Sequence, residues 1–145
     1  EYYKNRLQKN SIDFTIFLED DFSISINRGK IVQIIDNLIS NSEYWLIKLK
    51  GNDPNCKPSI TIKIESPWIY FYDNGYGISP AIENMLFEPF VTTKPKGEGR
   101  GLGLFIIQQL LDSSKCTIAL EPSRNEHGRK YIFAINFSNI INEYK

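Results

Sequence analysis

Residues 97 to 104 read Gly97-Glu98-Gly99-Arg100-Gly101-Leu102-Gly103-Leu104, and they run directly into an apolar, helix-periodic segment that ends at Leu111. Glycine loses more conformational freedom on folding than other residues, so this density predicts positive φ angles or a close approach of the backbone to a ligand. A glycine-rich loop that leads into a helix offers free N–H groups at the positive end of the helix dipole, where a phosphate binds well. The stretch therefore predicts a phosphate-binding loop in front of a helix over residues 102–111.

This loop differs from the two most widespread phosphate-binding motifs. A P-loop has Gly-Lys followed by Ser or Thr, whereas Gly29-Lys30 is followed by Ile31. A dinucleotide-binding fingerprint spaces its glycines by two and then by three residues, whereas the glycines at 97, 99, 101 and 103 alternate. The loop is of another nucleotide-binding type, which the rest of the chain must identify.

The bulk composition is that of one ordinary globular domain. With 145 residues, of which 41% are hydrophobic and 23% charged, the chain is long enough for a single sizeable core. Its 17 basic and 17 acidic residues balance, so we expect no contact with nucleic acid or with a membrane. No apolar run approaches the roughly 20 residues of a spanning helix. Two cysteines are too few for a disulfide framework, and we expect a cytoplasmic location.

The chain begins with Glu1, and its first ten residues are polar and rich in tyrosine. We expect residues 1–10 to be the tail of an upstream helix or a linker, and residues 11–145 to form the domain. On this interpretation the chain is a piece of a longer protein.

The strongest helix prediction covers residues 30–50. At about 100° per residue, its apolar side chains gather on one arc. They are Ile31, Ile34, Ile35, Leu38, Trp45 and Leu49. Asn37 and Asn41 lie one turn apart on the flank of this arc. Asparagine is a poor interior helix former, so the pair predicts a binding partner, although two asparagines alone fit solvent-facing amides equally well.

Alternating or continuous apolar runs predict strands over residues 12–18, 22–26, 59–65, 68–72, 116–120 and 130–137, with turns at 19–21 and 66–67. A short helix is expected over 80–85 and an irregular segment over 87–96. The strand over 68–72 ends immediately before Asp73 and a turn that contains Gly75 and Gly77. A carboxylate there can accept a hydrogen bond from an exocyclic amine such as that of adenine, and amide oxygens suit Mg²⁺.

Four segments carry a resemblance to a known family. They are Asn37-Leu38-Ile39-Ser40-Asn41, Asp73-Asn74-Gly75-Tyr76-Gly77, Leu86-Phe87-Glu88-Pro89-Phe90 and Gly99-Arg100-Gly101-Leu102-Gly103-Leu104. In this order they resemble the asparagine box, the first glycine box, the phenylalanine box and the second glycine box of the catalytic, ATP-binding domain of sensor histidine kinases. That domain belongs to the ATPase superfamily that includes gyrase B, the ninety-kilodalton heat-shock chaperones and MutL. The resemblance implies an α/β two-layer sandwich of the Bergerat type. Its sheet would be mixed and mostly antiparallel, with about five strands and about three helices on one face.

The resemblance also implies roles for individual residues. Asn41 would coordinate Mg²⁺ between the ATP phosphates, and Asn37 and Lys94 would act in catalysis, Lys94 by meeting the γ-phosphate from a lid. Asp73 would bind the adenine amine, with Trp45 beside the base. The wall of the base pocket would come from Gly75, Gly77 and Ile78, and the phosphate contacts from Gly99, Arg100, Gly101, Leu102 and Gly103. Phe87 and Phe90 would anchor the lid, which spans roughly residues 88–101; Lys96 and Arg100 are substitutes for Lys94.

Three positions bear on this resemblance. Tyr44 stands where many histidine kinases carry a basic residue, which points to Lys48, one turn later, as a replacement. Arg100 stands where a small residue such as threonine is frequent. His127 is the only histidine, and nothing around it resembles a phosphoacceptor motif. We expect His127 to be an exposed turn residue and the phosphoacceptor to lie upstream or on another protein.

Three functions are compatible with these features. The first is a kinase domain that transfers the γ-phosphoryl of Mg-ATP to a histidine of an upstream dimerisation domain, in a homodimer that acts on a response regulator. The second is a hydrolysing ATPase of the same superfamily, and the third is a regulatory nucleotide-binding module without turnover. Hydrolysing relatives carry a glutamate at the position of Asn37, and an amide cannot take a proton from water. Asp36 is adjacent but points about 100° away around the helix, so we favour the kinase.

Overall fold

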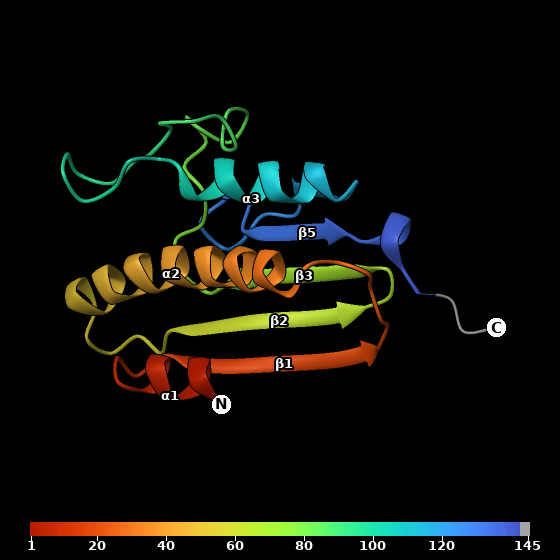
Figure 1. The fold of residues 1–145 in the computed structure, drawn as a ribbon. Coiled ribbons are helices and arrows are strands. Elements are labelled where there is room, and N and C mark those ends of the chain that lie inside the picture. The colour runs from red at the N-terminus through yellow and green to blue at the C-terminus, as the bar shows by residue number, and fades with distance from the viewer. Residues whose placement is uncertain (143–145) are drawn as a thin grey trace.

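A five-stranded mixed sheet forms one layer of the protein, as a computed structural model that describes residues 1–142 shows (Figure 1). The strands are β1 (Asp13–Asp20), β2 (Ser59–Glu65), β3 (Trp68–Asp73), β4 (Thr117–Leu120) and β5 (Ile132–Asn136), and they lie in the order β1-β2-β3-β5-β4. β1 is parallel to β2, and the other three pairs are antiparallel. The prediction of a mixed, mostly antiparallel sheet is confirmed.

The register of β2 against β3 decides where Asp73 points. Ile62 pairs with Phe71, and Ile60 pairs with Asp73. Side chains alternate between the two faces of a strand, so Asp73 shares the face of Phe71, which is buried. The last residue of β3 therefore presents its carboxylate to the layer of helices, not to the open face of the sheet.

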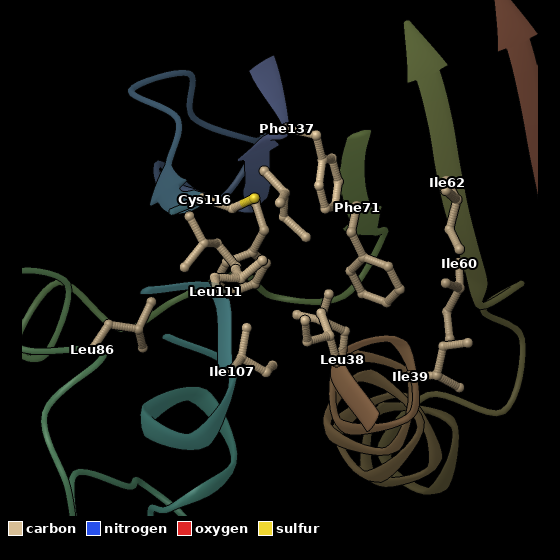
Figure 2. Packing of buried hydrophobic residues seen from close by; sticks show 14 of the residues in the cluster. Leu38, Ile39, Ile60, Ile62, Phe71, Leu86, Ile107, Leu111, Cys116 and Phe137 are labelled. Carbon is tan, nitrogen blue, oxygen red and sulfur yellow. The ribbon is translucent and has the colours of Figure 1, made fainter. Parts of the chain in front are cut away.

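Helices form the second layer. They are α1 (Tyr2–Gln8), α2 (Arg28–Asn52) and α3 (Gly103–Ser113), followed by the 3₁₀ helix η1 (Ser138–Ile140). α2 and α3 run across one face of the sheet (Figure 1). Figure 2 shows Leu38 and Ile39 of α2 and Ile107 and Leu111 of α3 pointing into the core that Phe71 of the sheet shares. The predicted two-layer sandwich is confirmed.

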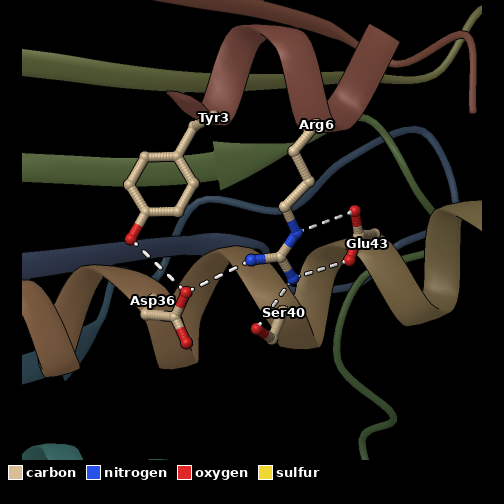
Figure 3. Close-up of polar contacts among 5 residues, drawn as sticks. All are labelled: Tyr3, Arg6, Asp36, Ser40 and Glu43. Carbon is tan, nitrogen blue, oxygen red and sulfur yellow. Dashed lines mark hydrogen bonds and ion pairs between the residues drawn. The ribbon is translucent and has the colours of Figure 1, made fainter. Parts of the chain in front are cut away.

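α1 is attached to this core and to α2. Leu7 is fully buried in the common core. The guanidinium of Arg6 donates to Asp36, Ser40 and Glu43 of α2, with its shortest bond, 2.8 Å, between Nη2 and Oε1 of Glu43 (Figure 3). The hydrogen bond to Glu43, together with the negative charges of Glu43 and Asp36, raises the pKa of Arg6 further above its usual range. All three helices thus lie on one side of the sheet.

Two predicted elements are wrong. Residues 22–26 form no strand and make only an isolated bridge between Ile24 and Ile141, because β1 pairs with β2 and not with the segment that follows it. Residues 80–85 form successive turns, with Ile82 N donating to Ser79 O and Met85 N to Ile82 O, in place of a helix. β1 also continues to Asp20, through part of the expected turn. Within residues 1–142, no helix combines the length and apolar character needed to cross a membrane.

Candidate nucleotide-binding site

Two adjoining cavities open between α2, the turn after β3 and the glycine-rich loop. The first, of about 170 Å³, is lined by Trp45, Asp73, Gly75, Tyr76, Gly77, Ile78, Arg129 and Tyr131, among others. The second, of about 300 Å³, is lined by Asn37, Ser40, Asn41, Arg100, Leu102 and the glycines at 99, 101 and 103, among others. Asn41 and Lys94 border both cavities. The structure therefore brings the predicted base-pocket residues to one cavity and the predicted phosphate-binding residues to the next.

Asp73 is held at the floor of the first cavity by two hydrogen bonds. Its Oδ2 accepts from the hydroxyl of Ser42 at 2.6 Å, and its Oδ1 accepts from the backbone N of Gly75 at 2.8 Å. Burial raises the pKa of Asp73, and these two bonds only partly offset that effect. Each oxygen keeps a free lone pair, so the carboxylate can accept a further bond from a ligand.

The turn after Asp73 requires its two glycines for different reasons. At Gly75, a Cβ would lie 3.0 Å from Oδ1 of Asp73, so a side chain would press on the carboxylate. Gly77 has a φ of +91°, in the left-handed region that favours glycine. Ile78 N, next along the chain, donates to Lys130 O at 2.9 Å. Trp45 of α2 also lines this cavity and is 37% exposed, which leaves its ring accessible to a ligand.

The two asparagines of α2 face the second cavity. Nδ2 of Asn37 is buried and has no hydrogen-bond partner in the part of the chain that the structure describes. A buried donor without a partner costs about 1–3 kcal/mol. Asn41 lies one turn later, where the two cavities meet. Asn37 lines the second cavity, so a rotation of its side chain would offer this amide to acceptor oxygens of a ligand bound there.

The glycine-rich loop ends at the N-terminus of α3, as predicted. Leu102 is the N-cap, and its side chain makes no capping hydrogen bond, so the first N–H groups of α3 stay available. Gly101 has a φ of +70°, and a Cβ there would lie 2.5 Å from the carbonyl carbon of Phe90. Phe90 N donates to Gly101 O at 2.9 Å, which closes the base of the lid. The loop thus combines free donors with a position, Gly101, whose backbone only glycine tolerates.

The two phenylalanines predicted to anchor the lid lie in different surroundings. Phe87 packs against the core, with its ring centroid 6.3 Å from that of Phe133. The side chain of Phe90 is 73% exposed and lines neither cavity, and its φ is +67°. Phe90 is thus joined to the glycine-rich loop through its backbone, whereas Phe87 supplies the buried contact.

Lys94, the cation predicted for the lid over residues 88–101, lies at the site. Lys94 borders both cavities, with its Nζ 4.4 Å from the centroid of the Tyr44 ring, and burial lowers its pKa. Glu98 of the lid accepts a 2.6 Å hydrogen bond from the hydroxyl of Tyr44 and lies 3.6 Å from Nζ of Lys48. Tyr44, which departs from the resemblance, and Lys48, its expected replacement, thus both bind the lid carboxylate. Lys96, the other substitute cation, lines neither cavity.

Ser42 and Arg129 are site residues that the sequence interpretation missed. The sequence could have identified Ser42, because it lies four residues after Leu38 and four before Leu46 on the buried arc of α2. A buried hydroxyl at such a position needs a polar partner. No signal in the sequence pointed to Arg129, since it follows a polar loop over residues 121–128 and precedes the strand predicted from residue 130. His127 lies in that loop and is exposed, with Nε2 3.6 Å from Oε1 of Glu126.

Comparison with known proteins identifies the family. Residues 26–139 match the family described as Histidine kinase-, DNA gyrase B-, and HSP90-like ATPase. The chain belongs to this family. Within it, this ATPase domain is of the sensor histidine kinase type, and it binds ATP.

Individual relatives agree with this assignment. The sensor protein ChvG of Rhizobium meliloti (strain 1021) is 29% identical to the ATPase domain over 130 residues, which cover 81% of this chain and 21% of that protein. The osmosensing histidine protein kinase SLN1 of Saccharomyces cerevisiae (strain ATCC 204508 / S288c) is 34% identical over 109 residues, which cover 69% and 9%. The chain therefore spans about a fifth or less of these curated relatives.

Solved structures agree as well. The catalytic domain of histidine kinase ThkA, in a nucleotide-free form, has a TM-score of 0.68 and 26% identity, covering 94% of this chain and 86% of that one. A mycobacterial sensor histidine kinase, MprB, has a TM-score of 0.74 and covers 99% of this chain and 93% of that one. At 15% identity, MprB supports the fold alone.

Proposed function

We propose that this chain presents Mg-ATP for transfer of the γ-phosphoryl group to a histidine on a separate dimerisation domain, in two-component signalling. The observation that carries the proposal is the pair of adjoining cavities. One holds a partly buried carboxylate, and the other holds a buried amide donor that has no partner within residues 1–142 and the free N-terminus of α3. A nucleoside suits the first environment and a chain of phosphates suits the second.

In the first cavity, Asp73 would accept a hydrogen bond from the exocyclic amine of adenine. Trp45 would contact the base from α2, and the turn from Gly75 to Ile78 would form the facing wall. Ser42 supports this role indirectly, because its bond to Oδ2 fixes the orientation of the carboxylate.

In the second cavity, the phosphates would bind the backbone N–H groups of the glycine-rich loop and of the start of α3. Nδ2 of Asn37 would donate to a phosphate oxygen, and Lys94 would meet the γ-phosphate from the lid. Arg100 borders the same cavity and adds a second cation.

Mg²⁺ fits at the junction of the cavities. The side chain of Asn41 makes no hydrogen bond within residues 1–142, and its amide oxygen is a hard ligand of the kind that Mg²⁺ takes together with phosphates and waters. When bound there, the ion would neutralise charge on the phosphates.

The second cavity lacks the group that hydrolysis needs. Its lining residues include no aspartate, glutamate or histidine among those that the structure describes. Asp36, next to Asn37 in the chain, is turned away and binds Arg6 and Tyr3 (Figure 3). Hydrolysis requires a residue that orients or deprotonates the attacking water. Transfer to an imidazole requires no such base on this domain, because the accepting nitrogen is itself the nucleophile.

His127 is unsuited to be the phosphoacceptor. Its ring lies 5.2 Å from that of Tyr76, which borders the first cavity and not the second. We infer that the acceptor lies on an upstream dimerisation domain, that the full protein is a cytoplasm-facing homodimer, and that a response regulator receives the phosphoryl group.

Phosphate release under saturating Mg-ATP tests the proposal against a hydrolysing ATPase. The isolated chain should turn over very slowly and should not phosphorylate itself, and His127→Ala should change neither result. Asn37→Glu, which adds a carboxylate to the second cavity, serves as the comparison and should turn over at least as fast. Turnover on the order of 1 s⁻¹ in the unmodified chain, the low end for ordinary enzymes, would contradict the kinase assignment.

A further inference from the structure

The loop between β4 and β5, residues 121–131, lies against the turn that follows β3. The sheet order places β5 beside β3, so the start of β5 adjoins the end of β3. Arg129 and Tyr131 at the end of this loop line the first cavity. We propose that Asn125 is a positioning residue of the nucleotide site, which fastens this loop to the glycine turn and so fixes one wall of the base cavity. The proposal rests on the proposed binding of a nucleoside in that cavity.

The side-chain amide of Asn125 binds two segments at once. Its Nδ2 donates to Tyr76 O at 3.0 Å and, at 3.5 Å, approaches Gly75 O. Its Oδ1 accepts from the backbone N of His127 at 2.9 Å and from that of Arg129 at 3.2 Å. The acceptor half therefore closes the loop on itself, and the donor half attaches the closed loop to the turn.

Gly77 shows how closely the loop is seated. A Cβ at Gly77 would lie 2.8 Å from Nδ2 of Asn125 and 2.8 Å from Cβ of Arg129. Real Cβ atoms do not approach neighbours at this distance, so the loop occupies the space that any other residue would need. The glycine is required by the neighbouring loop as well as by its own positive φ.

A second attachment lies farther from the cavity. Arg124 Nη2 is 3.1 Å from Oε1 of Glu83, and Lys130 Nζ is 3.9 Å from the same oxygen. The hydrogen bond from Arg124 lowers the pKa of Glu83. This ion pair holds the outer side of the loop, whereas Asn125 is the side chain that binds the backbone of the cavity wall itself.

Asn125→Asp tests the proposal because it separates the two halves of the amide. The carboxylate keeps the acceptors for the N–H groups of His127 and Arg129, and it removes the donor to Tyr76 O. Loss of one hydrogen bond, worth about 1 kcal/mol, should weaken the binding of adenosine and of ADP by about fivefold or more. Both ligands should weaken by the same factor, because the wall that Asn125 positions would contact the nucleoside that they share. Repulsion of phosphates by the new negative charge would weaken ADP alone.

Asn139→Asp is the matched control. Nδ2 of Asn139 donates to Lys115 O at 2.9 Å, and neither residue lines a cavity of the site. Both variants should lower the melting temperature by similar amounts, and Asn139→Asp should bind both ligands as the unmodified chain does. Adenosine affinity in Asn125→Asp within about twofold of the unmodified chain, a change smaller than 0.5 kcal/mol, would overturn the role of Asn125. A loss confined to ADP would also overturn it.

Hydrogen exchange on the unmodified chain tests the same idea if Asn125→Asp does not fold. Adenosine should slow exchange of the His127 and Arg129 amides, because both are bonded to Asn125 beside the occupied cavity. Unchanged rates at adenosine saturation would overturn the inference and leave nucleotide binding standing. Failure of the unmodified chain to bind adenosine and ADP would instead contradict the proposed site.

Discussion

Replacement of Asp73 by asparagine should change ligand affinity and protein stability in opposite directions. The carboxylate is partly buried and accepts bonds from Ser42 and Gly75. Asparagine keeps one acceptor oxygen for the Gly75 N–H, and its NH₂ can donate to the Ser42 hydroxyl. The hydrogen bonds inside the protein are thus preserved, whereas the ionised acceptor for the adenine amine is lost.

The affinity loss follows from the strength of a hydrogen bond to a charged group. Such a bond contributes about 1.5–3 kcal/mol, so adenosine and ADP should bind roughly ten- to a hundredfold more weakly to Asp73→Asn. In the unmodified chain, affinity should also fall as the carboxylate is protonated. Because burial raises the pKa of Asp73, this fall should begin at a higher pH than for an ordinary aspartate.

The stability effect has the opposite sign. A carboxyl whose pKa is raised on folding contributes most below its unfolded pKa and loses that contribution as pH rises through its folded pKa. At pH values above its folded pKa, the ionised Asp73 therefore destabilises the empty protein, and Asp73→Asn should unfold there at an equal or higher temperature. This difference should shrink as the pH is lowered toward the unfolded pKa, about 3.9.

Calorimetric titration with ADP, together with thermal unfolding at pH 7 and pH 5, measures both effects. Asp112→Asn is the control, because Asp112 is exposed and lies at the end of α3, outside both cavities. Unchanged ADP affinity in Asp73→Asn would refute the assignment of Asp73. A loss of affinity accompanied by a lower unfolding temperature would refute the reasoning from burial, since misfolding would then explain both results.

Three further predictions concern α1 and the lid. Arg6→Ala leaves the largely buried Glu43 without its cation and should lower the free energy of unfolding, measured by urea titration, by about 1–3 kcal/mol. Arg6→Lys should be intermediate in stability between Arg6→Ala and the unmodified chain. Equal urea midpoints for Arg6→Ala and the unmodified chain would contradict this prediction. Glu98→Gln should lower the pKa of Tyr44 from about 12 toward its ordinary value in an NMR titration, since the hydrogen bond to Glu98 is the main cause of the shift. Amide exchange in residues 91–100 should slow when a non-hydrolysable ATP analogue binds, and equal rates in the empty and loaded states would argue against a lid.

The central strands could be predicted almost to the residue. β2 matches its predicted range, and β3 extends it by one residue, because both have strong apolar patterns and meet at the turn of Ser66 and Pro67. Residues 22–26 have a similar pattern but no strand beside them. A local sequence pattern indicates that a segment could form a strand. Whether a neighbouring strand is present to pair with it depends on the order of strands in the sheet.

The same distinction explains which site residues could be predicted. Asn37, Asn41 and Asp73 lie at the sites because helix periodicity and a strand end place them there, so local rules suffice. Arg129 reaches the base cavity only because β5 lies between β3 and β4 in the sheet. No local pattern in a polar loop encodes that neighbour relation.

The partnerless amide of Asn37 has a consequence for how this domain could evolve or be engineered. Its buried Nδ2 makes the empty protein less stable than an otherwise identical chain with an apolar side chain at that position. A screen that selected only for thermal stability would tend to replace Asn37, and the selected variants would be more stable but would bind phosphate more weakly in the second cavity. Stability and ligand handling are therefore in conflict at this one nitrogen atom, and a stabilised version of the domain should be built from substitutions elsewhere.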